Sequence, residues 1–260
     1  MKAYYFTVML LSVPVLGLAQ RGPPGPAQTP RTAQEAAPVD LTGYWVSVVS
    51  EDWRWRMTTP ARGDFASIPL NPEGRRVGLA WDPDADAAAG LQCKAYGAPA
   101  IMRIPGRVHI TWQDQETLQI ETDAGIQTRL LRFNAAPAST EPPSRQGYSL
   151  ANWEQPAHGV GAPEAFNFFS SRIGRDPQSL EVMTTNLLLG YFRKNGPPHS
   201  ENAILQEYYD YHSQPNGDEW FTVTTVVTDP SYLLGVFITS SDFKKQQNAD
   251  GWNPMPCTVR

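Results

Sequence analysis

Apolar and polar residues alternate most regularly between residues 107 and 133, and this alternation predicts three consecutive β-strands. Successive side chains of a strand point to opposite faces of a sheet, so a two-residue period gives each strand one apolar and one polar face. The apolar positions are Val108, Ile110 and Trp112 in the first strand and Leu118 and Ile120 in the second, and the alternation returns around Ile126 to Leu130 in the third. We therefore expect an antiparallel meander with one buried face.

The loops between these strands decide which residues face each other. Gly125 can take the positive φ that the last position of a three-residue hairpin loop requires, so residues 123–125 are the expected second loop. That loop pairs Glu121 with Gln127, and Gln119 with Arg129.

The first hairpin needs a loop of odd length to keep like faces together, most simply residues 114–116. His109 then lies opposite Glu121, and Trp112 lies opposite Leu118.

The second half of the chain repeats this rhythm of strands and turns. We expect strands at residues 180–189, 191–194, 203–212, 219–228 and 236–243. Asn216-Gly217 fits a type I′ turn between the third and fourth of these, and Asn195-Gly196 is a further turn signal. With the earlier strands this makes about ten, closely spaced and with few helices, which is typical of a barrel or a closed sandwich.

Two short helices are expected between residues 69 and 92. Asn71 followed by Pro72, and Asp82 followed by Pro83, each place an N-capping residue directly before proline, which suits the first helical position. Before them, tryptophan and arginine alternate from Asp52 to Met57, which is the pattern of an amphipathic strand or of an aromatic, cationic ligand rim.

The N-terminal residues read as an export signal followed by a tether. Residues 1–19 have Lys2, a short apolar run and a small-residue cleavage site, as in a secretory signal peptide, and the run is too short for a membrane span. Residues 20–39, rich in Pro, Ala, Gln and Thr, predict a disordered linker. The barrel domain then occupies residues 40–260, with residues 134–145 as the best candidate for an internal seam.

Charge and cysteine content narrow the classes of partner. The formal net charge is −5, there are no basic clusters, and nucleic acid or an anionic membrane surface is therefore not an expected partner. Cys93 and Cys257 are the two cysteines, and in an exported protein they most simply form one disulfide. We expect a secreted or periplasmic protein without a metal or cofactor, because no metal-spaced His pair, phosphate-binding loop or dinucleotide fingerprint occurs.

Several motifs occur together in a recognisable order. They are Pro69-Leu70-Asn71-Pro72-Glu73-Gly74, Trp81-Asp82-Pro83, Cys93-x-x-x-Gly97-x-Pro99, Gly147-Tyr148-Ser149, Trp153-Glu154, Gly196-Pro197-Pro198-His199-Ser200 and Asp229-Pro230-x-Tyr232-Leu233; separately, Gly43-x-Trp45 at the head of the first strand resembles the entry of lipocalin-like barrels. This set resembles a large group of secreted, uncharacterised bacterial proteins with a lipocalin-like (calycin) β-barrel; Ala95 departs from the proline often found there. The resemblance implies export and an all-β fold, a single lipocalin-like antiparallel β-barrel with a small helical insertion. It implies no activity.

Four residues are candidates for acid–base chemistry. His199 follows a rigid Pro-Pro turn, Glu207 enters the next strand, Arg129 lies on the central meander, and Glu154 follows Trp153. If His199, Glu207 and Arg129 converge at a barrel mouth, they provide a base, an acid and an anion holder within hydrogen-bond reach. The structural alternatives are a turn-capping histidine and solvated charges.

The candidate ligand-binding residues form a wider set. They are Trp53, Arg54, Trp55, Arg56, His109, Glu121, Trp153 and Tyr208. Aromatic rings and guanidinium groups could bind an aryl or anionic molecule, and a luminal His109–Glu121 pair could transfer protons. The alternatives are core packing for the tryptophans and a solvated outer face for the pair.

Three functions follow from this reading. The first is a barrel that binds a small apolar or aromatic molecule. The second is a cofactor-free isomerase, lyase or hydrolase acting on such a molecule, and the third is a structural or surface-interaction protein with a filled barrel. A solvent-accessible cavity in the barrel would favour the first two functions over the third. A histidine next to a carboxylate inside that cavity would favour the enzyme over the binding protein.

Overall fold

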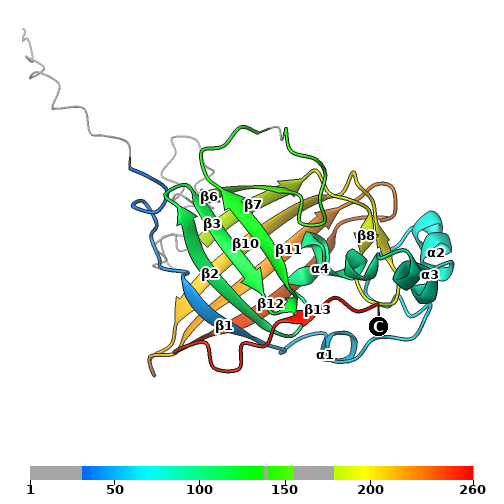
Figure 1. Cartoon of the computed structure of the whole chain (residues 1–260), viewed down its shortest axis with the longest axis horizontal. Coiled ribbons are helices and arrows are strands. Elements are labelled where there is room, and N and C mark those ends of the chain that lie inside the picture. Colours follow the sequence, from blue (N-terminus) through cyan, green and yellow to red (C-terminus); the bar gives the residue numbers. More distant parts are fainter. Residues whose placement is uncertain (1–30, 138–139, 155–178, 260) are drawn as a thin grey trace, which may run out of the picture. The chain divides into compact units, whose positions relative to one another are not determined.

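A computed structural model describes residues 31–137, 140–154 and 179–259. Nine strands of this part close into a barrel in the order β1-β12-β11-β10-β7-β6-β5-β3-β2 (Figure 1). Their bounds are β1 Gly43–Val48, β2 Arg107–Asp114, β3 Thr117–Thr122, β5 Gln127–Arg132, β6 Tyr148–Trp153, β7 Ser179–Thr185, β10 Ile204–Ser213, β11 Glu219–Thr228 and β12 Phe237–Gln246. The expectation of an all-β barrel with a small helical insertion is confirmed.

The remaining described elements lie outside the barrel sheet. They are α1 Trp53–Arg56, α2 Pro72–Leu79, α3 Pro83–Ala88, the 3-10 helix η1 Gln92–Tyr96, α4 Ala98–Ile101, and the short strands β4 Ala124–Gly125, β8 Gly190–Tyr191, β9 Pro198–His199 and β13 Met255–Pro256. The helices all fall between β1 and β2, which makes the insertion longer than residues 69–92. None of the helices in the described residues is long and apolar enough to cross a membrane.

The caps predicted for the two helices are present. The Asn71 side chain accepts a hydrogen bond from the Gly74 backbone at 2.8 Å, and the Asp82 side chain accepts from Asp84 and Ala85 at 3.0 and 3.2 Å. Each capping residue is followed by proline at the first helical position. The backbone N–H at this position has no partner within a helix, so its absence in proline costs no helical hydrogen bond.

The barrel strands are antiparallel with one exception. β5 and β6 run parallel and share only the pairs Leu131–Ser149 and Arg132–Leu150. These pairs place the end of β5 beside the start of β6, and the sequence between the two strands includes the Pro-rich residues 134–145.

The predicted pairing of the first hairpin is confirmed. His109 lies opposite Glu121, and Trp112 lies opposite Leu118, with a bulge between Trp112 and Asp114. The burial period excludes a one-residue slip, which would expose the apolar face, but it does not distinguish registers two residues apart. Asp114 pairs with Thr117, so the loop is shorter than the expected residues 114–116 and the bulge keeps the predicted register.

The predicted pairing of the second hairpin is wrong by one residue. Thr122 pairs with Gln127, so the loop holds four residues, and Ile120 rather than Gln119 faces Arg129. Ile126 takes φ 51°, which adds the extra residue. The cause is tertiary, since loop residues Ala124 and Gly125 pair as β4 with the C-terminal strand β13. The slip turns Arg129 from the expected outer face into the barrel.

The β10–β11 turn also differs from its prediction. A type I′ turn needs positive φ at both Asn216 and Gly217, but only Gly217 has it, with φ 86°. The turn instead runs from Gln214 to Gly217, whose backbone N–H donates to the Gln214 carbonyl at 2.9 Å. Pro215 explains this choice, because its fixed φ suits the second position of a type I turn.

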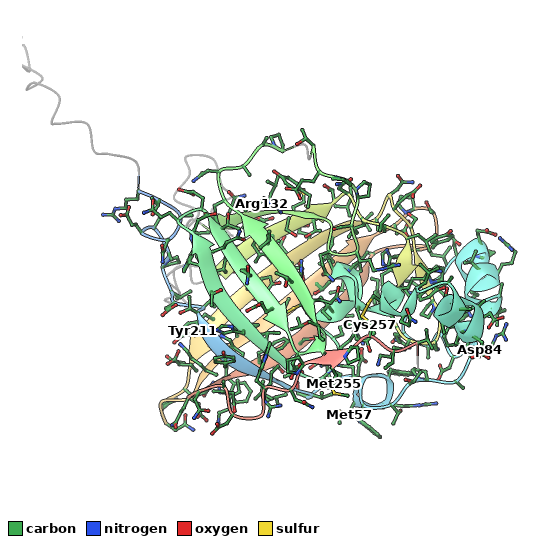
Figure 2. All side chains as sticks on the ribbon, viewed as in Figure 1. Met57, Asp84, Arg132, Tyr211, Met255 and Cys257 are labelled. Atoms are coloured by element: carbon green, nitrogen blue, oxygen red, sulfur yellow. A yellow bond between two sulfur atoms is a disulfide. The ribbon has the colours of Figure 1, made fainter. Side chains whose placement is uncertain are left out.

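Side chains fill the barrel from both ends. At one end Trp45, Phe221 and Phe243 pack with their rings 4.7 to 4.8 Å apart, and the Trp45 indole donates to the Leu41 carbonyl at 2.9 Å. At the other end Leu205, Val227, Phe237 and other inward residues pack against the segments that carry the helices. In Figure 2, Tyr211 marks the first end, and Cys257 lies near the helices.

Residues 31–39, predicted as part of the linker, lie in turns against the barrel. Ala33 is buried, and its carbonyl accepts a hydrogen bond from the Trp153 indole at 3.0 Å. The predicted signal peptide and residues 20–30 lie outside the described residues.

Candidate functional site: a cationic pocket beside the barrel

Arg129 and Glu207 meet inside the barrel. The Arg129 guanidinium donates to both carboxylate oxygens of Glu207, at 2.9 and 2.5 Å, and to the Tyr209 hydroxyl at 3.3 Å. Burial lowers the pKa of Arg129, but Glu207 and Tyr209 more than reverse this, so its pKa lies above the ordinary value. Arg129, Glu207 and Tyr209 have no exposed surface, so no water-sized space borders them.

His199 does not join this pair. It lies on the β8–β9 hairpin, where its Nδ1 is 3.3 Å from the Ser200 carbonyl and its ring packs on Phe192 at 5.5 Å. Burial lowers the pKa of His199 to about 4. The predicted convergence of His199 with Glu207 and Arg129 at a barrel mouth is therefore wrong.

Glu154 and Trp153 lie at the opposite end of the barrel, at the end of β6. Trp153 packs on Phe133 with ring centroids 5.5 Å apart, as the core-packing alternative has it. Glu154 is exposed, and partial burial followed by the charges of Asp210 and Glu181 raises its pKa.

His109, Glu121 and Tyr208 occupy the outer face of the barrel. His109 Nδ1 is 3.1 Å from the Glu121 carboxylate, and the His109 ring stacks on Tyr44 at 4.0 Å with Trp252 at its edge. Tyr208 is half-buried on β10, opposite Thr224 and Glu181. The His109–Glu121 pair therefore does not line the barrel lumen, and it lies on the solvated outer face, as in the alternative interpretation.

The alternating Trp–Arg segment forms the single-turn helix α1 rather than a strand. Residues two apart lie on opposite sides of a helix, so Trp53 and Arg54 are exposed while Trp55 is half-buried and Arg56 is buried. The expected aromatic and cationic rim is thus split, and only Trp55 and Arg56 face inward.

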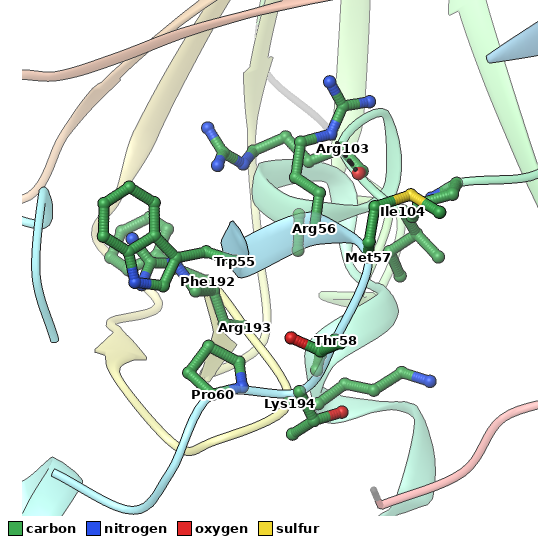
Figure 3. A pocket seen from close by; sticks show the side chains of 14 residues that line it. Trp55, Arg56, Met57, Thr58, Pro60, Arg103, Ile104, Phe192, Arg193 and Lys194 are labelled. Atoms are coloured by element: carbon green, nitrogen blue, oxygen red, sulfur yellow. Dashed lines mark hydrogen bonds between the residues drawn. The ribbon is translucent and has the colours of Figure 1, made fainter. Parts of the chain in front are cut away.

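These two residues line a cavity of about 300 Å³ between α1, α4 and the turn after β8 (Figure 3). Its lining is Trp55, Arg56, Met57, Thr58, Thr59, Pro60, Ala95, Ala100, Arg103, Ile104, Pro105, Phe192, Arg193 and Lys194. Four of these described residues are basic and none is acidic, although the whole chain carries a net charge of −5. We call this cavity the cationic pocket.

Two of its arginines are paired with carboxylates. Arg56 forms an ion pair with Glu51 and donates to the Arg103 carbonyl at 2.9 Å. Arg103 forms an ion pair with Asp52 at 2.9 Å, and its guanidinium lies 5.6 Å from the centre of the Phe237 ring at the barrel end. Arg103 Nη1 has no hydrogen-bond partner.

Arg193 is held differently. It is 6% exposed, and among the described residues no carboxylate lies within ion-pair distance of it. Its Nη2 donates to the Ala66 carbonyl at 2.6 Å and the Ser67 hydroxyl at 2.8 Å, while Nε and Nη1 have no acceptor. Burial, with the nearby charge of Arg103, lowers the pKa of Arg193 to about 10.

A tight turn positions Arg193 and Lys194. Gly196 donates its backbone N–H to the Arg193 carbonyl at 3.3 Å and takes φ 91°, with Trp81 packed too closely for any side chain there. Asn195 is fully buried and donates to the Ala61 and Asp64 carbonyls at 3.0 and 2.8 Å, which ties the turn to the opposite pocket wall.

No pattern in the sequence identifies Arg103, Arg193 or Lys194 as site residues. Arg193 and Lys194 precede the predicted turn at Asn195-Gly196, which is present, but the local sequence does not indicate which part of the protein this turn contacts. Only the fold brings them beside α1.

Comparison with known proteins identifies no relative of this chain. No family model matches the chain, and neither a curated protein nor a solved structure is significantly similar to it. Within the described residues, no three His, Cys, Asp or Glu side chains are grouped so that they could hold a metal ion.

Proposed function

We propose that this β-barrel protein binds a small organic anion in the cationic pocket, with the apolar or aromatic part of the ligand against Trp55, Met57 and Ile104. The single observation that supports this is the lining of the cavity, which carries four basic and no acidic side chains, one of them the buried Arg193. The proposal keeps the small aromatic ligand expected of the barrel but moves it from the lumen to this pocket.

Burying a charge without a partner is unfavourable by several kcal/mol, and unsatisfied donors add to this. Burial is the main cause that lowers the pKa of Arg193, the charge of Arg103 adds to it, and Asp52 and Asp64 offset part of it. An anion in the cavity would offset the mutual repulsion of the basic side chains that line it.

The size and lining of the cavity support a small ligand. A volume of 300 Å³ is at the lower end of ligand pockets, which are mostly apolar with a few placed polar groups. Trp55 and Phe192 supply aromatic surface, and Trp55 covers Arg193 with its ring 5.4 Å from the guanidinium carbon. A planar ligand body could pack on the same ring.

We propose further that the protein acts in an exported, oxidising compartment. The Cys93–Cys257 disulfide, with sulfurs 2.02 Å apart, supports this, as does the signal-like sequence of residues 1–19. Intact mass measurement of protein from a secreting host tests it, since cleavage after Ala19 is expected and an uncleaved N-terminus contradicts it.

The experiment for the binding proposal compares Arg193→Met with the matched control Arg75→Met, which removes the same charge from the exposed face of α2. Calorimetry should show binding of benzoate or phenyl phosphate to the wild type and to Arg75→Met, and about 10- to 100-fold weaker binding to Arg193→Met. Benzyl alcohol, which has the ring without the charge, should not bind measurably. Equal affinity in both variants would contradict the proposal.

Stability separates a binding role from a structural one. Arg193→Met removes the hydrogen bonds to the Ala66 carbonyl and the Ser67 hydroxyl but also removes a buried charge that has no ion pair among the described residues, so the free energy of unfolding should fall by less than about 3 kcal/mol. A loss of 3 kcal/mol or more in urea unfolding would mean that Arg193 holds the fold instead.

The filled-barrel function is the second candidate, and the burial of the luminal side chains favours it. It predicts that no anion binds any variant. For the enzyme alternative, Arg129 and Glu207 are the two of the four acid–base candidates that meet, and they have no exposed surface for a substrate to reach.

A further inference from the structure

We infer that the protein forms a two-fold symmetric dimer through an uncharged part of its outer barrel surface on β7, β10, β11 and β12. This surface is defined by six outward-facing residues, and we call it the aliphatic face: Met183, Ile204, Gln206, Val226, Thr228 and Ile238. None of the six lines the cationic pocket, so the inference does not depend on the proposed function.

The strand register makes this face continuous. Met183 pairs with Gln206, Gln206 pairs with Val226, and Val226 pairs with Ile238, so these four side chains form one row across four neighbouring strands. Three of these strands, β10 to β12, are coloured yellow to orange in Figure 1. The row therefore crosses a single stretch of the barrel surface.

The aliphatic side chains of this face are exposed to solvent. Ile238 is 59% exposed and Met183 46%. In the next row of the same face, Ile204 lies opposite Thr228 and is 46% exposed. The solvated side of an antiparallel sheet normally carries polar residues, and neighbouring exposed aliphatic residues mark interaction surfaces.

The outer face of the same strands is charged toward the β10–β11 turn. There Asp210 and Asp242 both lie opposite Thr222, and Lys244 lies opposite Trp220. None of the six residues of the aliphatic face is charged, although the chain has a net charge of −5. Two copies of an acidic protein repel each other, and at this face they can meet without bringing like charges together.

The polar members of the face also suit a second copy. A two-fold axis brings the same set of residues together from both sides, so the surface must be complementary to itself. Gln206 and Thr228 each carry a donor and an acceptor and can pair with their own copies, which lysine or aspartate cannot. Gln206 also holds the bordering Glu181 carboxylate at 2.8 Å.

A lipid surface matches this face less well than a second copy does. Residues that anchor a protein at lipid headgroups are tryptophan, lysine and arginine, and none of the six is of these types. Stable interfaces use about 20 to 30 residues on each side. The aliphatic face is smaller, so we expect a weak dimer with a dissociation constant of about 10 to 100 µM.

The test is sedimentation equilibrium on the whole protein from about 5 to about 200 µM, a range that brackets this constant. The wild type should pass from monomer to dimer. Ile238→Asp should raise the dissociation constant at least about tenfold, because it buries an unpaired charge in the interface. Ile126→Asp is the matched control, since Ile126 is 60% exposed on the loop before β5 and the change adds the same charge there.

A variant of opposite charge separates the interface from general repulsion. Thr228→Arg makes the acidic chain less negative, yet it should weaken the dimer because it places an arginine in the aliphatic face. Thr228 is exposed, so this variant should keep its fold, which circular dichroism checks. Raising the salt concentration should strengthen the dimer by screening the repulsion between copies.

Four outcomes would overturn the inference. The first is a wild type that stays monomeric at the highest concentration. The second is a dimer that neither Ile238→Asp nor Thr228→Arg weakens, because the copies then meet elsewhere. The third is equal weakening by Ile238→Asp and Ile126→Asp, which would assign the effect to charge alone. The fourth is a monomer that binds phosphatidylcholine vesicles and loses this binding in Ile238→Asp, which would make lipid the partner.

Discussion

At the scale of single residues, the molecule holds two buried arginines in opposite ways. Arg129 is ion-paired with Glu207 inside the barrel and leaves its Nε without an acceptor, whereas Arg193 has no carboxylate within ion-pair distance among the described residues and lines a cavity. A buried charge paired with a carboxylate is a structural element, and one without such a pair beside a cavity is a candidate for binding. This contrast is the reason for placing the site outside the barrel.

The buried pair gives a prediction with an internal control. Arg129→Met leaves the Glu207 carboxylate without a partner, so the protein should lose about 3 to 5 kcal/mol of unfolding free energy. The double variant Arg129→Met/Glu207→Leu removes both charges and should recover most of that loss. Urea unfolding of both measures it; a double variant less stable than Arg129→Met would mean that the pair stabilises the fold in itself.

His199 predicts a pH dependence of stability. Its folded pKa of about 4 lies below the ordinary value near 6.5, so between these the unfolded state binds the extra proton. Stability should therefore fall by up to about 3 kcal/mol as the pH drops from 6.5 to 4, with no further loss from this group below. His199→Asn, which keeps a donor for the Ser200 carbonyl, should flatten this part of the curve, and the partly exposed His212→Asn should not. Equal slopes in both variants would assign the acid sensitivity to other groups.

At the scale of elements, the sequence predicts strands well where burial follows a local period. The bounds of β11 are those expected, and the His109–Glu121 register is correct, because each depends only on which face is buried. The failures have non-local causes. The register of the second hairpin differs by one residue from the prediction, and its loop pairs with the C-terminal tail. Residues 53–56 form α1 instead of a strand, and there Arg56 donates to the Arg103 carbonyl, a contact between segments far apart in the sequence. The cationic pocket is formed by three segments that are brought together by the fold, namely α1, α4 and the turn after β8. Of its basic residues, the sequence therefore predicts only Arg56 of α1 as a ligand-binding candidate.

The extra residue in that loop is strained, and this can be measured. Ile126 is exposed and takes φ 51°, a region that a β-branched residue enters at a disadvantage of about 1 to 2 kcal/mol. Ile126→Gly should therefore raise the unfolding free energy by up to about 1 kcal/mol, after the entropy that glycine adds to the unfolded chain. Ile238→Gly, at an exposed position near the start of β12 where it is paired with Val226, should lower it. A loss of stability in Ile126→Gly would show that its side chain contributes contacts that outweigh the strain.

At the scale of the whole molecule, the cationic pocket lies where two distant parts of the chain meet. The β1–β2 insertion supplies α1 and α4, the β8 turn supplies Arg193 and Lys194, and the tail touches this turn from outside the pocket through the contact of Thr258 with Lys194. The tail is fixed by its short pairing with β4 and by the disulfide to η1, the helix that also carries Ala95 and Tyr96. The barrel acts as the rigid base against which these parts are held.

The disulfide is therefore predicted to affect both stability and the pocket. It joins residues 164 positions apart, so the chain-entropy account gives up to about 5 kcal/mol of stabilisation for the intact bond. Cys93→Ala/Cys257→Ala should lose a large part of this in urea unfolding. It should also free the tail, and with it the contact between Thr258 and Lys194, so phenyl phosphate should bind several-fold more weakly at temperatures where the variant is still folded. Removal of residues 255–260 from the wild type is the matched control, because it should reproduce the binding loss by the same route. If the double variant binds as the wild type does while that truncation weakens binding, the tail stays in place without the covalent bond, and the disulfide serves the fold alone.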